Sequence, residues 1–358
     1  MTIKQKLLCW AERVAPRAPK PPTPTARRYV LWSITHLGDV VLQLPAATAL
    51  KRARPQADVA MVVKTPFRSL VELCPDVDQI FCYDPRWSTR PDQARSGLRQ
   101  TAHLRRQLAR FDVAFIFDFH PLSRLLLRWA RIPALVGYGS SSSCLSLPLS
   151  HPPPDRHRLE EGLALLAAAG LPLAEAEFQL QLPASVQARA QEQLRQEGWQ
   201  GEPFLALCPG SGNPQKCWPL ERFAAVANWL TQNALRALLL GSTYDQHRAQ
   251  AVAARLRVPP LNLVGRTDVC QLAALLALSE LVLTNDSGAM HLAAALGRPL
   301  LALFGPTDPA RWGPRGPGPS RVLRASTGHM QDLSVETVVG TIEKHFPSLP
   351  ERCPRPIV

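Results

Sequence analysis

Short apolar runs recur along the first half of the chain, separated by segments in which polar residues dominate. We predict a strand at each run, namely Tyr29–Ile34, Val59–Val63, Gln79–Tyr83, Val113–Phe117 and Ala134–Tyr138. Because the runs are continuous rather than alternating, they are typical of parallel strands that are covered on both faces. After the first run, a loop over residues 35–39 leads into a helix predicted over residues 40–53, with Pro45 near its first turn.

A second series of apolar runs begins near residue 203 and alternates with segments of helical pattern. We expect strands at 204–208, 236–240, 261–264, 281–284 and 299–304, and helices at 220–230, 245–256, 268–278 and 287–296. Two such series predict an α/β chain with two doubly wound domains. We expect an N-terminal arm at 1–26, domains at 27–183 and 184–346, and a tail at 347–358. The ligand site is expected in a cleft between the domains, where the strands end.

Composition excludes several classes of protein. Of 358 residues, 46% are hydrophobic, so the chain can form sizeable cores and is not a disordered protein. No apolar run approaches the roughly 18–20 residues that a membrane-spanning helix needs. The 8 cysteines form no CxxC pair, and we expect them to be buried thiols in a reducing compartment.

Positive charge is concentrated in the first part of the chain. Residues 1–150 hold 22 basic and 10 acidic side chains, a net charge of 22 − 10 = +12, whereas residues 151–358 hold 19 and 18, a net of +1. A partner of the first half is therefore expected to be anionic: nucleic acid, an anionic lipid surface or an acidic substrate. The N-terminal arm lacks the pattern of a secretory signal. Its first 14 residues form either a short amphipathic helix on a membrane surface or a basic tail.

Two loops of the second half are candidate phosphate sites. Asp286, Ser287 and Gly288 connect a predicted strand to a predicted helix, whose N-terminus offers free N–H groups and positive potential. An ordinary capped helix is the alternative. In the loop over residues 209–219, Ser211 and backbone N–H groups could hold phosphate oxygens while Lys216 neutralises them. The alternative is a lysine in a solvated loop.

Carboxylates of the first half offer a candidate base. Asp39 follows the first predicted strand, where a carboxylate can accept a proton from an attacking hydroxyl. Capping of the next helix is the alternative. Asp76 and Asp78 have the spacing of a metal-binding pair, but they precede a strand, so we read them as turn residues and expect no metal site.

Four motifs in this order resemble the bacterial ADP-heptose:lipopolysaccharide heptosyltransferase family, over residues 29 to about 345. The motifs are Leu37-Gly38-Asp39-Val40-Val41 with Pro45, Pro209-Gly210-Ser211 with Lys216 and Trp218-Pro219, Asn285-Asp286-Ser287-Gly288 with His291, and Phe304-Gly305-Pro306-Thr307-Asp308-Pro309 with Gly313-Pro314. The resemblance implies the GT-B fold, in which two Rossmann-like domains face each other across a cleft. The first domain would hold the acceptor and the second the nucleotide sugar.

The resemblance also implies roles for single residues. Asp39 matches the catalytic base. The implied donor-binding residues are Ser211, Lys216, Asp245, Asp286, Ser287, Gly288 and His291, with Asp245 at the ribose and Asp286 at the sugar. His120 and Arg124 are candidate acceptor-binding residues, since they follow a strand of the acceptor domain. One departure concerns Ser33, which stands six positions before Asp39, where many members carry a basic residue.

The implied activity is an inverting transfer of heptose from ADP-heptose to the lipopolysaccharide inner core, with no required cofactor. The implied partners are an anionic lipid-linked glycan and the inner-membrane surface, for a cytoplasmic protein that associates peripherally with the cytoplasmic face. Three alternatives stay open: a GT-B transferase with another glycan acceptor, a sugar-nucleotide epimerase, and a nucleic-acid binder. The sequence shows neither a helix-turn-helix pattern nor a basic strand with interleaved aromatic residues, so we expect no nucleic acid partner.

Overall fold

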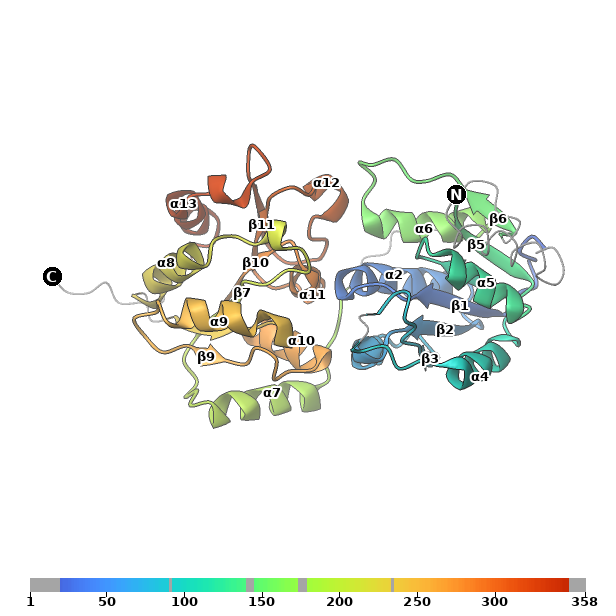
Figure 1. Cartoon of the computed structure of the whole chain (residues 1–358), viewed down its shortest axis with the longest axis horizontal. Helices are drawn as coiled ribbons and strands as arrows, with labels where there is room; N and C mark the ends of the chain where they lie inside the picture. The colour runs from blue at the N-terminus through green and yellow to red at the C-terminus, as the bar shows by residue number, and fades with distance from the viewer. Residues whose placement is uncertain (1–19, 90–91, 140–144, 173–178, 233–234, 348–358) are drawn as a thin grey trace. The chain divides into compact units, whose positions relative to one another are not determined.

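The protein consists of two compact units, Met1–Glu177 (unit 1) and Phe178–Val358 (unit 2). The computed structural model describes residues 20–89, 92–139, 145–172, 179–232 and 235–347. The expected domain boundary, between residues 183 and 184, lies a few residues after the division into units. Most of the predicted arm, including its helix over 1–14, and the tail from residue 348 lie outside the described residues. Figure 1 shows both units.

Unit 1 is a six-stranded sheet with the order β3-β2-β1-β4-β5-β6, and every neighbouring pair is parallel (Figure 1). Its strands are β1 (Arg28–Ser33), β2 (Asp58–Val63), β3 (Gln79–Cys82), β4 (Val113–Ile116), β5 (Ala134–Tyr138) and β6 (Leu147–Leu149). Its helices are α2 (Leu37–Ala53), α3 (Arg68–Val71), α4 (Leu98–Leu108), α5 (Pro121–Trp129) and α6 (Arg158–Ala168). The five predicted strands are confirmed, and β6 is an addition at the sheet edge.

Both faces of this sheet are covered, which explains the continuous apolar runs. Val30 and Trp32 of β1 pack in one core with Leu104 of α4 and Leu126 of α5. Because successive side chains of a strand point to opposite faces, Tyr29 and Leu31 face the other side. They are also buried. Helices α2 and α6 pack against each other, as do α4 and α5.

Unit 2 is a second parallel sheet, with the order β12-β11-β10-β7-β8-β9. Its strands are β7 (Phe204–Cys208), β8 (Arg236–Leu239), β9 (Leu261–Asn262), β10 (Leu281–Asn285), β11 (Leu300–Phe304) and β12 (Ser320–Arg324). Its helices are α7 (Ala184–Gln196), α8 (Leu220–Thr231), α9 (Gln246–Ala253), α10 (Val269–Leu278), α11 (Gly288–Ala295), α12 (Pro309–Trp312) and α13 (Val335–His345). The side of β7, β10 and β11 that carries Leu205, Leu283 and Leu301 packs on residues of α8, α9 and α13.

The two sheets have the same topology. Numbered within each unit, both follow the order 3-2-1-4-5-6 of the Rossmann fold. In this fold the chain leaves the first and fourth strands, which are neighbours, in opposite directions, and ligands bind at their carboxyl ends. The switch point lies between β1 and β4 in unit 1 and between β7 and β10 in unit 2.

Two predicted helices differ from those observed. Helix α2 begins at Leu37 and not at residue 40, because extended His36 accepts a hydrogen bond from Val40 N at 3.0 Å. Pro45 therefore lies well inside the helix rather than near its first turn. The helix predicted from Asp245 begins instead with a 3₁₀ turn at Thr243–Asp245, followed by α9. In the described part of the chain, no helix has the length and apolar character needed to cross a membrane.

Candidate active site

Asp39 lies in the first turn of α2, beside the end of β1. Its side chain is 14% exposed, and its Oδ1 accepts a hydrogen bond from Nε of Arg158 at 3.0 Å. The N-cap of α2 is His36, and no side chain makes a capping hydrogen bond there. The alternative role of Asp39 as a helix cap is therefore wrong, and its carboxylate is one half of an ion pair.

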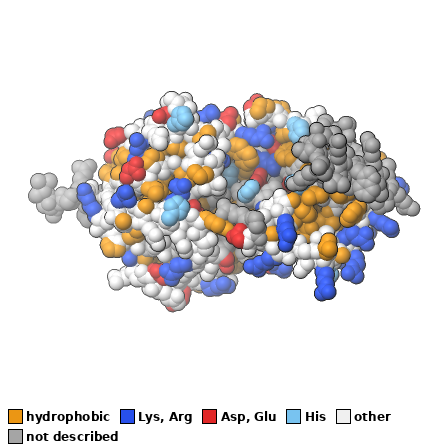
Figure 2. Space-filling view, viewed as in Figure 1, with side chains coloured by type: hydrophobic (Ala, Val, Ile, Leu, Met, Phe, Trp, Pro, Cys, Tyr) orange, Lys and Arg blue, Asp and Glu red, His pale blue; other side chains and the backbone are white. Residues whose placement is uncertain are grey.

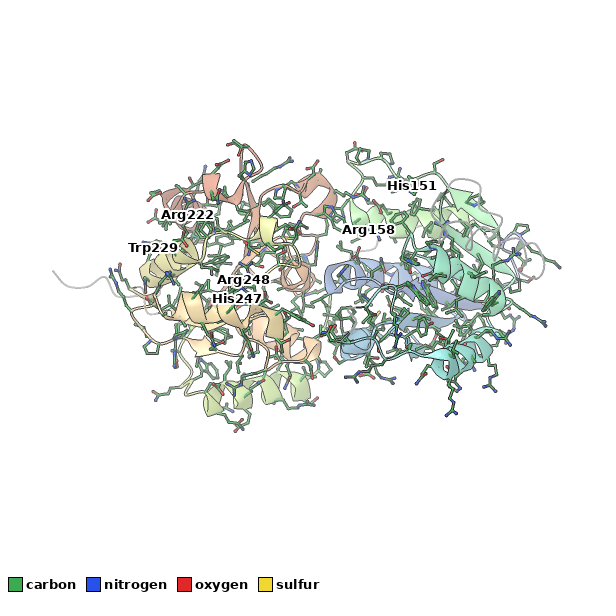
Figure 3. All side chains as sticks on the ribbon, in the orientation of Figure 1. His151, Arg158, Arg222, Trp229, His247 and Arg248 are labelled. Atoms are coloured by element: carbon green, nitrogen blue, oxygen red, sulfur yellow. The ribbon has the colours of Figure 1, made fainter. Side chains whose placement is uncertain are left out.

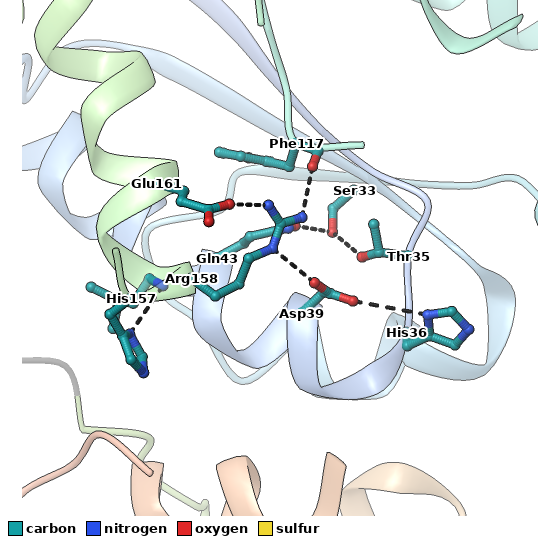
Figure 4. Close-up of polar contacts among 10 residues, drawn as sticks. Ser33, Thr35, His36, Asp39, Gln43, Phe117, His157, Arg158 and Glu161 are labelled. Carbon is teal, nitrogen blue, oxygen red and sulfur yellow. Dashed lines mark hydrogen bonds and ion pairs between the residues drawn. The ribbon is translucent and has the colours of Figure 1, made fainter. Parts of the chain in front are cut away.

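Arg158 is fixed by three segments of unit 1, as Figure 4 shows. Beyond Asp39, its Nη1 donates to Glu161 Oε2 at 2.5 Å and its Nη2 donates to the carbonyl of Phe117 at 2.9 Å. Arg158 is the first residue of α6 and projects toward α2 (Figure 3). Burial alone lowers the pKa of the guanidinium, but the charge of Asp39 and the bond to Glu161 raise this pKa more, so the net shift is upward.

Further charged groups gather at the carboxyl end of this sheet. Lys64 follows β2 and is 8% exposed; burial lowers the pKa of its ammonium, against the opposing charges of Asp84, Asp39 and Asp118. Asp118 follows β4 and accepts hydrogen bonds from Trp32 Nε1 at 2.9 Å and Ser123 Oγ at 2.7 Å. Burial raises the pKa of the Asp118 carboxyl. The switch point of unit 1 is therefore rich in buried charge.

His120 and Arg124 are both structurally engaged. The Nδ1 of His120 caps α5 by accepting from Leu122 N at 3.2 Å, and its ring stacks on Trp87 with centroids 5.9 Å apart. Arg124 donates to the carbonyl of Tyr138 at 2.6 Å. Neither is a freely solvated helix-start residue, and their role in acceptor binding stays a prediction.

In unit 2, Asp286 lies at the end of β10 and is 4% exposed. Its Oδ2 receives two donors, Lys216 Nζ at 2.7 Å and Thr307 Oγ1 at 2.7 Å. Ser211 Oγ donates to the backbone carbonyl of Asp286 at 3.0 Å. The structure thus brings together Ser211, Lys216 and Asp286, which the sequence placed in separate loops. Thr307 is an additional member of this cluster.

The loop that carries Ser211 and Lys216 is held by Asn285, which is fully buried. Its Oδ1 accepts from Trp218 N at 3.0 Å, and its Nδ2 donates to the carbonyl of Pro209 at 2.9 Å. One amide therefore fixes both ends of the loop against β10. Lys216 is consequently positioned rather than solvated, and its alternative reading as a loop lysine in water is wrong.

Asp245 lies over Gly210 on the other side of the same loop. Its Oδ2 accepts from Ser242 N at 2.9 Å and from Ser242 Oγ at 2.7 Å. A Cβ atom built on Gly210 would lie 2.1 Å from Asp245 Oδ1, so any larger residue here would require this carboxylate to move. The contact of Asp245 with a ribose stays a prediction.

Helix α11 begins two residues after Asp286. Ser287 is its N-cap residue but makes no side-chain capping bond; its hydroxyl lies 3.2 Å from Thr284 Oγ1. Gly288 opens the helix, and His291, one turn further, is 3% exposed. The free N–H groups at the start of α11 therefore lie beside the Lys216–Asp286 pair, at the switch point of unit 2.

A cavity of about 1120 Å³ lies between residues 214–222 and 324–331. Arg222 and Arg248, on α8 and α9, contribute to its wall (Figure 3). None of the predicted donor-binding residues lines it. The polar groups that can bind a diphosphate converge at the switch point instead, and a donor site there stays a prediction.

Asp76 and Asp78 stabilise the turn before β3. Thr48 Oγ1 donates to Asp76 at 2.6 Å, while Asp78 accepts from Val59 N at 2.7 Å and pairs with Lys51. These contacts fit the expected turn role. Over the residues that the structure covers, no three His, Cys, Asp or Glu side chains gather in a way that could hold a metal ion.

Comparison with known proteins identifies the family. The profile of glycosyltransferase family 9 (heptosyltransferase) matches residues 101–342, more than half of the chain. The chain belongs to glycosyltransferase family 9. The family resemblance expected from the four motifs is thereby confirmed.

Relatives of known function lie within this family. The lipopolysaccharide heptosyltransferase 2 of Salmonella typhimurium is 34% identical over 155 residues, which is 42% of this chain and 44% of that protein. The match thus spans less than half the length of this relative. The lipooligosaccharide heptosyltransferase 2 of Haemophilus ducreyi is 28% identical over 76% of this chain and 82% of its own.

A solved structure agrees with the fold of this family 9 chain. The ADP-heptose lipopolysaccharide heptosyltransferase II of E. coli superposes with a TM-score of 0.75 at 24% identity, covering 91% of this chain and 99% of that one. The likeness confirms the GT-B fold with two Rossmann-like domains. The cleft between these domains, which the resemblance implies, stays a prediction.

Sequence reasoning missed three residues of these two polar clusters. Thr307 lies within the fourth motif but had no role, because nothing local shows that its hydroxyl reaches Asp286. Arg158 and Glu161 carry no motif, and Arg158 is 119 positions away from Asp39. Only the packing of α6 on α2 brings them together.

Proposed function

We propose that the protein is an inverting glycosyltransferase that transfers heptose from ADP-heptose to the inner core of lipopolysaccharide. The observation that carries the proposal is the cluster of Lys216, Asp286 and Thr307 beside the start of α11, in a chain of a heptosyltransferase family. A cation, a sugar-facing carboxylate and free N–H groups at one switch point suit a sugar diphosphate.

ADP-heptose is proposed as the donor, since the relatives are heptosyltransferases and the E. coli structure is named for this donor. The diphosphate would bind at the N–H groups of Ser287 and Gly288 with the aid of Ser211 and Lys216. Asp286 would accept hydrogen bonds from sugar hydroxyls, and Asp245 from the ribose. His291, buried in α11, would support the helix start from within.

Asp39 is proposed as the catalytic base. Its carboxylate takes the proton of an acceptor hydroxyl, and the oxygen forms a bond to the anomeric carbon of the heptose. The bond from this carbon to the diphosphate breaks at the same time, and the electron pair leaves with ADP. Lys216 and the N–H groups of α11 stabilise the charge on the departing diphosphate, so the step needs no metal from the protein.

The acceptor is proposed to be an anionic, lipid-linked glycan at the membrane surface. Unit 1 supplies the positive charge for it: Arg99, Arg105 and Arg106 of α4 are exposed, and Leu98 at its start is 91% exposed. Figure 2 shows Lys and Arg side chains standing out from this part of unit 1. A basic, partly apolar helix face suits peripheral binding to anionic lipid on the cytoplasmic side. His120 and Arg124 lie deeper and are proposed to contact the glycan.

The experiment that tests the proposal replaces the base. Asp39→Ala is expected to lower kcat for transfer from ADP-heptose to a heptose-deficient lipopolysaccharide acceptor by about 100- to 10,000-fold, the range for a general base. Binding of ADP, measured by calorimetry, is expected to be unchanged, because its proposed contacts all lie in unit 2.

Asp155→Asn, at an exposed carboxylate of unit 1, is the matched control and should retain full activity. More than a few per cent of wild-type kcat in Asp39→Ala would remove Asp39 from the role of base. Turnover of ADP-heptose without any acceptor would favour an epimerase. An unchanged core in the lipopolysaccharide of a deletion strain would exclude the proposed acceptor.

A further inference from the structure

Arg158 joins three separate segments of unit 1 through its three guanidinium nitrogens. Nε donates to Asp39 of α2, Nη1 to Glu161 of α6 and Nη2 to the backbone carbonyl that follows β4 (Figure 4). Its side chain is only 7% exposed. A planar guanidinium bonded at all three nitrogens cannot rotate without breaking a charge-assisted bond, so its orientation is fixed.

Glu161 explains why the guanidinium points its Nε at Asp39. Glu161 is 1% exposed, and a buried carboxylate requires a charged partner. Glu161 accepts from Nη1 of the guanidinium, which leaves Nε to donate to Asp39. Arg158 and Glu161 together carry no net charge, so they orient Asp39 while neutralising it less than an unpaired arginine would.

The contact uses only one oxygen of the proposed base. Oδ1 of Asp39 is bonded to Arg158, whereas Oδ2 lies 3.9 Å from Nδ1 of the exposed His36, beyond hydrogen-bond distance. No other partner of Oδ2 is present among the described residues. The carboxylate is thus held on one side and open on the other, as a base that must accept a proton from a ligand requires.

The cation that pairs with Asp39 does not come from the preceding strand, β1. Position 33, at the end of β1, holds a fully buried serine whose hydroxyl bonds to Gln43 of α2. Ser33 and Gln43 thus form a neutral hydrogen-bonded pair, and position 33 contributes no positive charge. Arg158 supplies the positive charge from α6 instead.

We propose that Arg158 is a positioning residue for Asp39, and that Glu161 holds Arg158 in place for this purpose. The proposal rests on the proposed function, in which Asp39 is the base. It adds a buried Glu161–Arg158–Asp39 chain that sets which oxygen of the base faces the acceptor hydroxyl.

The first test replaces the arginine. Arg158→Met is expected to lower kcat about 10- to 100-fold, because a misplaced catalytic group loses this much, while KM for ADP-heptose and the Kd of ADP change less than about twofold. Guanidinium ion added at millimolar concentration should restore part of the lost kcat. Arg158→Lys should remain impaired, because one ammonium cannot reach three partners in the fork geometry.

Removing only the arginine leaves Glu161 buried without its cation, which can prevent folding. Arg158→Met combined with Glu161→Met replaces the buried pair with apolar side chains and is expected to keep a Tm near that of the wild type. This double variant should show the same loss of kcat as Arg158→Met. Arg68→Gln, at the exposed Arg68–Glu72 pair of unit 1, is the control and should change nothing.

A double-mutant cycle separates positioning from an independent contribution. If Arg158 acts through Asp39, adding Arg158→Met to Asp39→Ala causes no further loss of kcat. If the kcat losses of Asp39→Ala and Arg158→Met multiply in the double variant, the proposal is overturned. A folded Arg158→Met/Glu161→Met variant with wild-type kcat would also overturn it. Full activity of Asp39→Ala would instead contradict the base itself, so the failure of the proposed function is distinguishable from the failure of the positioning role.

Discussion

The two charged sites differ at the level of single atoms. In unit 1, Asp39 is paired through one oxygen and has the other open, whereas in unit 2 the Oδ2 of Asp286 already holds both Lys216 and Thr307. The carboxylate of Asp286 therefore already holds a cation, whereas the carboxylate of Asp39 has one oxygen open to a proton donor. This contrast supports the different roles proposed for the two residues, although both are carboxylates at switch points.

Lys216 is expected to serve binding and catalysis together. Lys216→Met should weaken ADP-heptose affinity and lower kcat, each by about 10- to 100-fold, because the charge that meets the diphosphate is lost. Calorimetry with ADP and steady-state kinetics measure the two effects. Lys344→Met, at an exposed lysine of α13, is the control. Unchanged donor affinity and turnover would remove Lys216 from the site.

Gly210 offers a test of the close contact under Asp245. Gly210→Ala should lower the free energy of unfolding by about 1–3 kcal/mol, because the new methyl group would overlap the Asp245 carboxylate. Gly212→Ala, two residues along the same loop, meets open space and should have little effect. Urea unfolding compares the two variants. Equal stabilities would show that the Asp245 turn moves aside at no cost.

At the scale of secondary-structure elements, ten of the twelve strands in the described residues could be predicted, whereas β6, β12 and several helices could not. The predicted strands are continuous apolar runs because both faces of their sheets are covered, but the edge strands β6 and β12 are partly exposed and give no such signal. Helix α4 has no comparable signal, since its sequence is mostly polar and only Leu104 and Leu108 are buried. The start of α2 was misjudged because Gly38 and Asp39 are typical loop residues, while the first hydrogen bond of the helix is donated by Val40 N to the backbone carbonyl of His36.

Asp112 ties the starts of β1 and β4 together and makes stability depend on pH. Its Oδ2 accepts from Arg27 N at 3.0 Å and Arg28 N at 2.9 Å. Burial raises the pKa of this carboxyl, but these bonds and the Arg28 guanidinium lower it more, so the net shift is downward. A pKa below the unfolded value means that the stabilisation is present above pH ~4 and is lost as pH falls through the folded pKa.

Asp112→Asn is expected to lower the free energy of unfolding at pH 7 by about 1 kcal/mol; the effect is small because the side chain is 31% exposed. The decrease in stability between pH 5 and pH 3 should be smaller in the variant than in the wild type. Denaturant unfolding across this pH range gives both quantities. An identical pH dependence would show that Asp112 is not linked to folding.

At the scale of the whole molecule, the positive charge is divided unevenly: unit 1 has 24 basic and 15 acidic side chains, a net charge of 24 − 15 = +9, whereas unit 2 has 17 and 13, a net of +4. The sequence predicted this division and both Rossmann-like domains. It could not predict the Arg158–Asp39 contact or the place of Thr307, because each depends on how elements far apart in the chain pack. Local signals locate the strand ends, and tertiary packing decides which side chains meet there.

The basic face of α4 is expected to bring the protein to its acceptor. Reversing Arg99, Arg105 and Arg106 to Glu should reduce binding to vesicles that contain anionic lipid and raise KM for the lipid-linked acceptor, with ADP affinity unchanged. Vesicle sedimentation at low and moderate salt measures the first effect. Reversal of Arg195, Arg255 and Arg257 in unit 2 is the matched control. Undiminished vesicle binding after reversal in α4 would exclude this surface.

The repeated strand order has a consequence for how the chain loses its structure. Each sheet has its own apolar core, so each unit can unfold cooperatively as a separate domain. If the unfolding curve of the whole chain were fitted to a single two-state transition, the fit would combine two transitions with different midpoints. A nucleotide that binds only the second half would raise the free energy of unfolding of that half alone, by about 2.7 kcal/mol at a hundredfold excess over its Kd, and would so separate the midpoints of the two transitions.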